Sequence, residues 1–127
     1  MRMRWHSCRR LRADKVVSVR VQEEDFSIEV EWSKCRARMG GDGGAIVAFA
    51  GLVRERFENH EIRGLQLEHY PGMTEASMKS IGDYAAKKWS LLDVLIIHRV
   101  GVLKPSDQIV LVMVGSGHRP DAFAACE

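Results

Sequence analysis

Apolar and polar residues alternate at the start of the patterned part of the chain, where Val17, Val19 and Val21 are separated by Ser18 and Arg20. A period of two predicts a half-buried strand. Four further apolar runs predict strands, at Ala45–Gly51, Gly64–Tyr70, Val94–Val100 and Gln108–Gly115. The run Ile109–Val114 is continuous enough to indicate a central position in a sheet.

Two other segments of the chain show helical patterns. The segment Asp25–Arg38 fits a strand by the alternation of Phe26, Ile28, Val30 and Trp32, and it also fits one helical face, so the pattern alone leaves both open. A clearer helix is predicted from an N-cap at Thr74 to about Lys88. Its expected core-facing stripe is Met78, Ile81 and Ala85.

Breakers and polar stretches separate the elements. Gly40–Gly44 lacks the residues of a phosphate-binding glycine loop and is interpreted as a link. Leu52–Arg63 is polar and predicts a mobile loop, and Lys104–Asp107 predicts a turn. Pro120 and Asp121 are typical of a helix start, and the sequence ends at Glu127 within that expected helix.

Composition limits the class of protein. With 127 residues, 46% hydrophobic and 28% charged, one globular domain is expected, and the longest apolar stretch, Ala45–Val53, falls short of the roughly 18 residues of a membrane span. Residues 1–15 carry six basic side chains and one acidic one, a net +5, so the rest carries −3 against a total of +2. We therefore expect a basic extension at 1–15, a folded domain at 16–127, and no membrane or nucleic-acid partner.

The cysteines and histidines have no metal-binding spacing. Cys8, Cys35 and Cys126 are widely separated, without a Cys-x-x-Cys pair. They predict free thiols in a reduced cytoplasmic compartment, and the five histidines show no close metal-ligand spacing either.

Two short clusters carry candidate chemistry, each directly after a predicted buried strand. Arg54 follows the first, and His118 and Arg119 follow the second. Arginine binds phosphate or carboxylate with a fork of donors, and histidine can move a proton near neutral pH. Two guanidinium groups that converge there would suit an anionic ligand, although an arginine at a strand end is more often only solvated or paired with an acid.

A resemblance to a known family is stronger evidence of function than any of these single residues. Residues 43–125 resemble the large, catalytic subunit of molybdopterin synthase in six blocks that occur in order. The blocks are Gly44–Val47 leading to Phe49-x-Gly51-x-Val53-Arg54, Leu67–Thr74, Ile97–Gly101, Pro105-x-Asp107-x-Ile109-Val110, His118-Arg119 and Ala122-Phe123. Val16–Arg38 is similar to the family's opening strand and helix, which favours a helix for Asp25–Arg38.

The resemblance implies an α+β fold of the α/β-hammerhead type, with a mixed or antiparallel sheet and flanking helices. It also implies a homodimer within a heterotetramer. Each large subunit would bind a small ubiquitin-like sulfur carrier, whose C-terminal Gly-Gly thiocarboxylate supplies sulfur to cyclic pyranopterin monophosphate. By this resemblance Arg54, with Leu52 and Val53 beside it, binds substrate, and His118 and Arg119 form the phosphate pocket. By the same resemblance Arg54, His118 and Arg119 are the expected catalytic residues, and neither a metal nor a bound cofactor is implied.

One departure from the family bears on activity. Family members continue through a full helix to two lysines with essential roles, and no residue of this sequence matches either lysine. Three hypotheses follow: a sulfurtransferase represented by an incomplete copy, a non-catalytic homologue that binds carrier or pterin, and a nucleic-acid adaptor that uses the basic residues 1–15. The third is weakest, because no recognition motif accompanies those residues.

Overall fold

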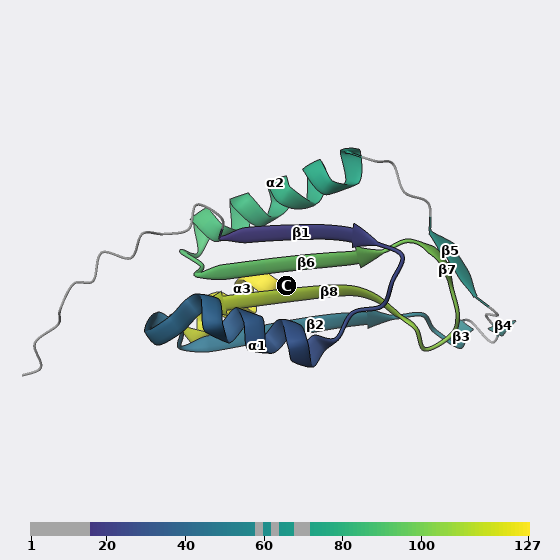
Figure 1. Cartoon of the computed structure of the whole chain (residues 1–127), viewed down its shortest axis with the longest axis horizontal. Helices are drawn as coiled ribbons and strands as arrows, with labels where there is room; N and C mark the ends of the chain where they lie inside the picture. Colours follow the sequence, from purple (N-terminus) through teal and green to yellow (C-terminus); the bar gives the residue numbers. More distant parts are fainter. Residues whose placement is uncertain (1–15, 58–59, 62–63, 68–71) are drawn as a thin grey trace, which may run out of the picture.

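A mixed four-stranded sheet organises the molecule. The computed structural model describes residues 16–57, 60–61, 64–67 and 72–127. The sheet has the order β1-β6-β8-β2, in which β1 is parallel to β6 and the other neighbours are antiparallel (Figure 1). The strands are β1 (Val17–Gln22), β6 (Asp93–Arg99), β8 (Gln108–Ser116) and β2 (Ala45–Leu52).

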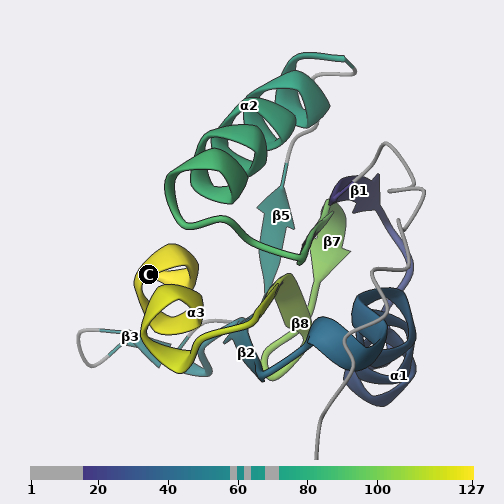
Figure 2. The same ribbon diagram turned by 90° about the vertical axis from the view of Figure 1, so that its left-hand side faces the viewer.

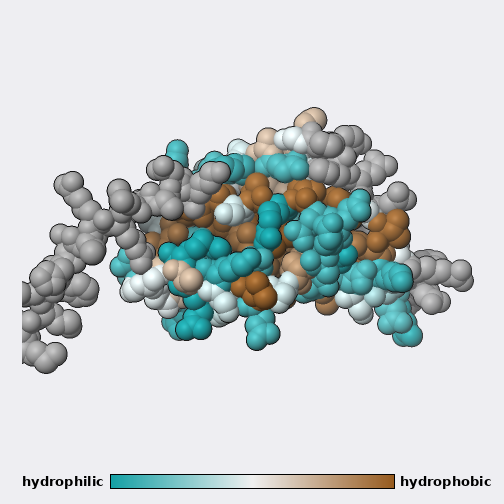
Figure 3. All heavy atoms as spheres, in the orientation of Figure 1, coloured by the Kyte–Doolittle hydropathy of each residue, from teal (hydrophilic) through white to brown (hydrophobic). Residues whose placement is uncertain are grey.

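Helices cover both faces of this sheet. Figure 2 shows α1 (Ile28–Met39) on one face and α2 (Met73–Lys88) with α3 (Arg119–Cys126) on the other. Alternation along β6 divides the core accordingly: Leu95 and Ile97 join the cluster under α1, and Val94 joins the cluster with Ala85 of α2 and Ala122 of α3. The outer side of α1 is mostly hydrophilic, as Figure 3 shows on this side of the molecule.

Local chemistry explains why α1 is a helix although its sequence also alternates. The Ser27 hydroxyl accepts a hydrogen bond from the backbone N–H of Val30, which is an N-cap, and Glu29 and Glu31 lie in the first turn. Cys35 and Met39 are buried one turn apart against the sheet. A short 3₁₀ turn, η1 (Gly40–Asp42), then leads into β2, so the Gly40–Gly44 segment links two elements as expected.

Two small ribbons lie at one end of the main sheet (Figure 1). The first pairs β3 (Arg56–Phe57) with β4 (His60–Glu61), and the second pairs β5 (Leu65–Leu67) with β7 (Gly101–Leu103). The β3–β4 ribbon corrects the prediction of a loop over Leu52–Arg63, since its two-residue strands are too short to produce a hydrophobic pattern. Of the expected strand Gly64–Tyr70, residues 68–70 lie outside the described residues.

The α2 helix differs from its prediction at two points. Gly72, rather than Thr74, is the N-cap, and its N–H donates to the Glu75 carboxylate at 2.9 Å. Ile81 is 66% exposed, so it does not belong to the buried stripe. Gly82 is buried in its place, and a Cβ there would lie 2.6 Å from Val17 Cγ1. The helix therefore packs on β1 through a glycine, which brings the two backbones close.

The α+β class with flanking helices is confirmed. Among the described residues no helix is long and apolar enough to cross a membrane. The expected basic extension at 1–15 lies outside the described residues, and its role stays a prediction.

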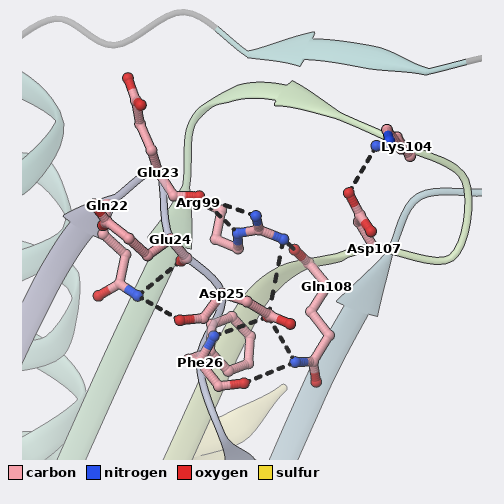
Figure 4. A network of polar contacts seen from close by, with 9 residues as sticks. All are labelled: Gln22, Glu23, Glu24, Asp25, Phe26, Arg99, Lys104, Asp107 and Gln108. Atoms are coloured by element: carbon pink, nitrogen blue, oxygen red, sulfur yellow. Dashed lines mark hydrogen bonds and ion pairs between the residues drawn. The ribbon is translucent and has the colours of Figure 1, made fainter.

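Arg99 holds the connection between β1 and α1 in place (Figure 4). Its Nε and Nη2 atoms donate to the Glu23 carbonyl at 3.1 and 2.9 Å, and its Nη1 donates to the Gln108 carbonyl at 3.0 Å. The Gln108 amide in turn donates to the Asp25 carboxylate and to the Phe26 carbonyl, both at 2.9 Å. Arg99 is thus a structural residue at the end of β6.

Candidate functional site

Hydrogen bonds of the preceding residue, Val53, hold the backbone in place where the chain leaves β2 and reaches Arg54. The N–H of Val53 donates to the Asp107 carbonyl and the Val53 carbonyl accepts from the Ser106 N–H, both at 2.9 Å. The Val53 side chain is buried, whereas Leu52 and Arg54 are exposed. Val53 therefore anchors the backbone from which its two neighbours project, and only Leu52 and Arg54 present side chains to a ligand from this segment.

The second cluster lies where β8 becomes α3. The buried Ser116 hydroxyl accepts from the His118 N–H at 3.1 Å, and the His118 carbonyl accepts from the Ala122 N–H at 3.3 Å as the helix begins. His118 is the N-cap residue, and its side chain makes no capping hydrogen bond. Arg119 is the first helical residue, and both side chains are exposed. A helix N-terminus and a guanidinium at the same place favour an anion.

Gly44 sets the position of this second cluster. Its N–H donates to the Ser116 carbonyl at 2.9 Å. A Cβ at Gly44 would collide with the Gly117 carbonyl oxygen. The start of β2 therefore touches the backbone directly before His118, and a glycine is required for that contact.

The structure does not bring the two clusters together within one chain. Because β2 and β8 are antiparallel, Leu52 pairs with Gln108 and Ala45 pairs with Ser116. Arg54 thus lies beyond one end of the β2–β8 pair, and His118 and Arg119 lie beyond the other. The strand β2 between them has eight residues and is about 23 Å long at about 3.3 Å per residue, so the two clusters are at least that far apart. The convergence of two guanidinium groups that the sequence suggested is wrong for a single chain.

A groove that the sequence analysis missed adjoins the second cluster. It has a volume of about 610 Å³ and lies between α1 and the start of β2. Trp32 and Arg36, one turn apart on α1, line it together with Gly43, Gly44 and Ile46. A tryptophan and an arginine spaced i, i+4 on a helix, with Trp32 still 38% exposed, were the available signal.

The two thiols whose pKa values are raised, Cys35 in α1 and Cys126 in α3, are structural. Burial, together with a hydrogen bond and the nearby charge of Asp93, raises the pKa of the Cys35 thiol to about 12. Burial also raises the pKa of Cys126. Both are free thiols, as expected, while Cys8 lies outside the described residues. The described residues contain no cluster of three or more metal-ligating side chains.

The fold and the candidate site define an α+β protein with positively charged residues at two separate positions, one at each end of the β2–β8 strand pair.

Comparison with known proteins identifies the family to which this chain belongs. Residues 21–127 match the family model described as MoaE protein. The chain is 50% identical over 110 residues to the molybdopterin synthase catalytic subunit of Ralstonia nicotianae, an alignment that covers 87% of this chain and 62% of that relative.

Solved structures give the same result. The molybdopterin biosynthesis MoaE protein from Burkholderia ambifaria superimposes with a TM-score of 0.79 at 43% identity, covering 87% of this chain and 71% of that one. A complex of subunits 1 and 2 of the molybdopterin-converting factor from Helicobacter pylori contains a chain with TM-score 0.65 at 19% identity, covering 87% and 72%, which supports the fold. The chain belongs to the MoaE family. It spans about three fifths of the length of the Ralstonia relative.

Proposed function

We propose that this chain acts as a molybdopterin synthase catalytic subunit, a sulfurtransferase that moves sulfur from a small carrier protein to cyclic pyranopterin monophosphate. The observation that carries the proposal is the family match over residues 21–127, within which Arg54, His118 and Arg119 stand at exposed strand ends. The proposed reaction is biosynthetic, and we expect it to take place in the cytoplasm.

His118 and Arg119 bind the phosphate of the pterin substrate in this scheme. The first turn of α3 offers backbone N–H groups, and Arg119 adds a permanent positive charge. The histidine ring holds or releases a proton near neutral pH. Such fixed donors also stabilise negative charge that develops during acyl and sulfur transfer.

Arg54 and Leu52 contact the substrate or the tail of the carrier. The carrier is a small ubiquitin-like protein whose C-terminal Gly-Gly thiocarboxylate is negatively charged, which suits the Arg54 guanidinium. The exposed Leu52 offers an apolar contact for the tail. The assembly is a homodimer of this chain within a heterotetramer that includes two carriers.

The test is turnover with thiocarboxylated carrier and cyclic pyranopterin monophosphate, with dithiolene product as the readout. Product formation supports the proposal. Carrier binding without product favours a non-catalytic binding homologue instead, and absence of both contradicts the proposal.

Substrate binding tests the phosphate pocket separately. Arg119→Ala should weaken pterin binding, measured by calorimetry, by about 1.5–3 kcal/mol, the value of a hydrogen bond to a charged group. Lys87→Ala removes a positive charge from the exposed surface of α2 and should leave the affinity unchanged. Equal affinity of the Arg119 variant and the wild type would remove Arg119 from the site.

A further inference from the structure

Ser116, the last residue of β8, places a buried hydroxyl in an apolar part of the core. The residue is 1% exposed. Because side chains alternate along a strand, Ser116 lies on the same face of the sheet as Val114, which belongs to the cluster with Ala85 of α2 and Ala122 of α3. A buried hydroxyl costs free energy unless it is hydrogen-bonded, and an alanine would avoid that cost. Packing alone therefore does not account for a serine here.

The hydroxyl is used to turn the chain out of the sheet. It accepts a hydrogen bond from the N–H of His118 at 3.1 Å. A serine that accepts from the N–H two residues later closes a tight local turn, which competes with regular secondary structure. The turn contains Gly117 and lies between the end of β8 and the start of α3. The Ser116 hydroxyl therefore fixes the backbone of His118.

Ser116 is itself held by the sheet on both sides. Its carbonyl accepts from the Gly44 N–H at 2.9 Å, and Ser116 pairs with Ala45 in the β2–β8 register. On the other side of β8, the carbonyl of Gly115 accepts from the Leu92 N–H at 2.9 Å. Two separate segments of the chain thus hold the end of β8, and the hydroxyl extends this rigidity to His118.

The His118 side chain has no such support of its own. His118 is the N-cap residue of α3, with extended backbone angles (φ −130°, ψ 130°), and its exposed side chain makes no capping hydrogen bond. A capping side chain bonds to the N–H of the second or third helical residue, and the second one here is Pro120, which has no N–H. The position of the ring therefore follows from the backbone that Ser116 fixes.

We propose that Ser116 is a positioning residue, whose hydroxyl holds His118 where its ring meets the pterin substrate. This rests on the proposed function, because it takes His118 to bind that substrate. Ser116 is too deeply buried to touch a ligand itself. Its effect on binding therefore passes through His118, which distinguishes it from a residue that only stabilises the fold.

The size of the effect follows from the loss of one hydrogen bond. Ser116→Ala removes the acceptor and leaves the His118 N–H without it. Pterin affinity should fall roughly three- to tenfold, which corresponds to about 0.6–1.4 kcal/mol and lies in the range of a single hydrogen bond. Calorimetric titration with cyclic pyranopterin monophosphate measures this change, and an unchanged affinity would overturn the proposal.

A double-mutant cycle tests whether Ser116 acts through the His118 ring. The same titration would be made on Ser116→Ala, His118→Ala and the double variant. If the hydroxyl serves the ring, Ser116→Ala weakens binding only while the ring is present, and the double variant binds as His118→Ala does. An equal fold-loss from Ser116→Ala in both backgrounds would contradict positioning of His118.

Val114→Ala is the matched control for stability. Val114 is also 1% exposed and lies two residues earlier on the same face of β8. Its truncation leaves a cavity and should lower the Tm at least as much as Ser116→Ala does, with pterin affinity unchanged. If Val114→Ala weakens binding as much as Ser116→Ala, a softened core explains both losses and the proposal fails.

Amide hydrogen exchange examines the same hydrogen bond in the unsubstituted protein and without substrate. The His118 N–H has an acceptor, whereas the N–H of Arg119, at the first position of α3, precedes the intrahelical hydrogen bonds. The His118 amide should therefore exchange at least about tenfold more slowly than the Arg119 amide. Equal rates would show that the hydroxyl does not hold His118.

The substrate-free measurement separates two possible failures. A wild type that binds no pterin contradicts the proposed function, and with it a role of Ser116 in binding, while hydrogen exchange still decides whether the hydroxyl holds His118. A wild type that binds the pterin, with Ser116→Ala at equal affinity, contradicts the positioning role and leaves the proposed function standing.

Discussion

Arg38 and Asp93 join the last turn of α1 to the first residue of β6 through two parallel hydrogen bonds. Arg38 Nε donates to Asp93 Oδ1 at 2.7 Å, and Nη2 donates to Oδ2 at 2.8 Å. Asp93 is 2% exposed, whereas the Arg38 side chain is 38% exposed. Arg38 therefore reaches in from the protein surface and neutralises the buried Asp93 carboxylate.

Loss of this arginine should destabilise the fold. Arg38→Ala leaves the Asp93 carboxylate without its charged partner, so the free energy of unfolding should fall by about 1.5–3 kcal/mol, less than for a fully buried pair because water can reach the position. Urea unfolding measures this change. Arg36→Ala, on the exposed side of the same helix, should change stability by less than about 0.5 kcal/mol, and similar losses in both variants would contradict the assignment.

The buried thiol of Cys35 should be chemically silent in the folded protein. Its pKa of about 12 leaves almost no thiolate near neutral pH, and the side chain has no exposure. Alkylation at pH 8, followed by peptide mass spectrometry, should label Cys35 only after denaturant is added. Rapid labelling of Cys35 under native conditions would show that α1 opens from the sheet.

The contact between Gly44 and Gly117 predicts a matched pair of variants. Gly44→Ala forces a Cβ onto the Gly117 carbonyl and should cost about 1–3 kcal/mol of stability, with a displaced His118 and weaker anion binding. Gly41→Ala meets nothing within 4 Å and should be tolerated. Thermal melts and pterin titration of both variants check this, and a neutral Gly44→Ala would show that the segment before His118 can move.

Arg99 should matter for stability rather than for binding. Arg99→Met removes three donors from the Glu23 and Gln108 carbonyls, so unfolding should become easier by at least about 1.5–3 kcal/mol, the value of one hydrogen bond to a charged group. Arg56→Met, an exposed arginine, serves as the control for charge. If pterin affinity falls while stability is unchanged, the structural role is wrong.

Asp25 predicts a pH dependence on the acid side. The hydrogen bond from the Gln108 amide, and then that from the Phe26 N–H, hold the pKa of Asp25 below its ordinary value of 3.8. A lowered carboxyl pKa adds stability that is complete above the unfolded value and is lost as the pH falls through the folded value. Between about pH 6 and pH 3, stability of the wild type should therefore fall more than that of Asp25→Asn. Parallel curves from urea unfolding would contradict this.

The sequence predicted the main strands well because their side chains alternate or are wholly apolar. It placed Ile109–Val114 in the centre of the sheet, and β8 does lie between β6 and β2. The face of α2 was misjudged at Ile81, because a buried glycine at position 82 carries no hydrophobic signal although it permits the close contact with Val17. Short ribbons such as β3–β4 have too few residues to form a pattern.

The sequence placed the candidate residues Arg54, His118 and Arg119 directly after strands, and all three do lie just beyond strand ends, with Arg119 as the first residue of α3. Their mutual placement could not be predicted, because it depends on the direction in which β2 and β8 pair. Parallel pairing would have brought the two ends together, and the antiparallel register separates them. Such pairing is a property of residues distant in sequence, which local patterns do not encode.

The order of the strands also constrains how the chain can fold as it is synthesised. The strand β8 is the partner of both β6 and β2, although among the described strands it is the last to be made. Until Gln108–Ser116 leaves the ribosome, β2 has no strand to pair with in the main sheet, and β1 must wait for β6. The uncharged strand β2 therefore lacks its sheet partner from its own synthesis until that of β8, and in this interval an apolar strand is open to chaperones and to wrong partners.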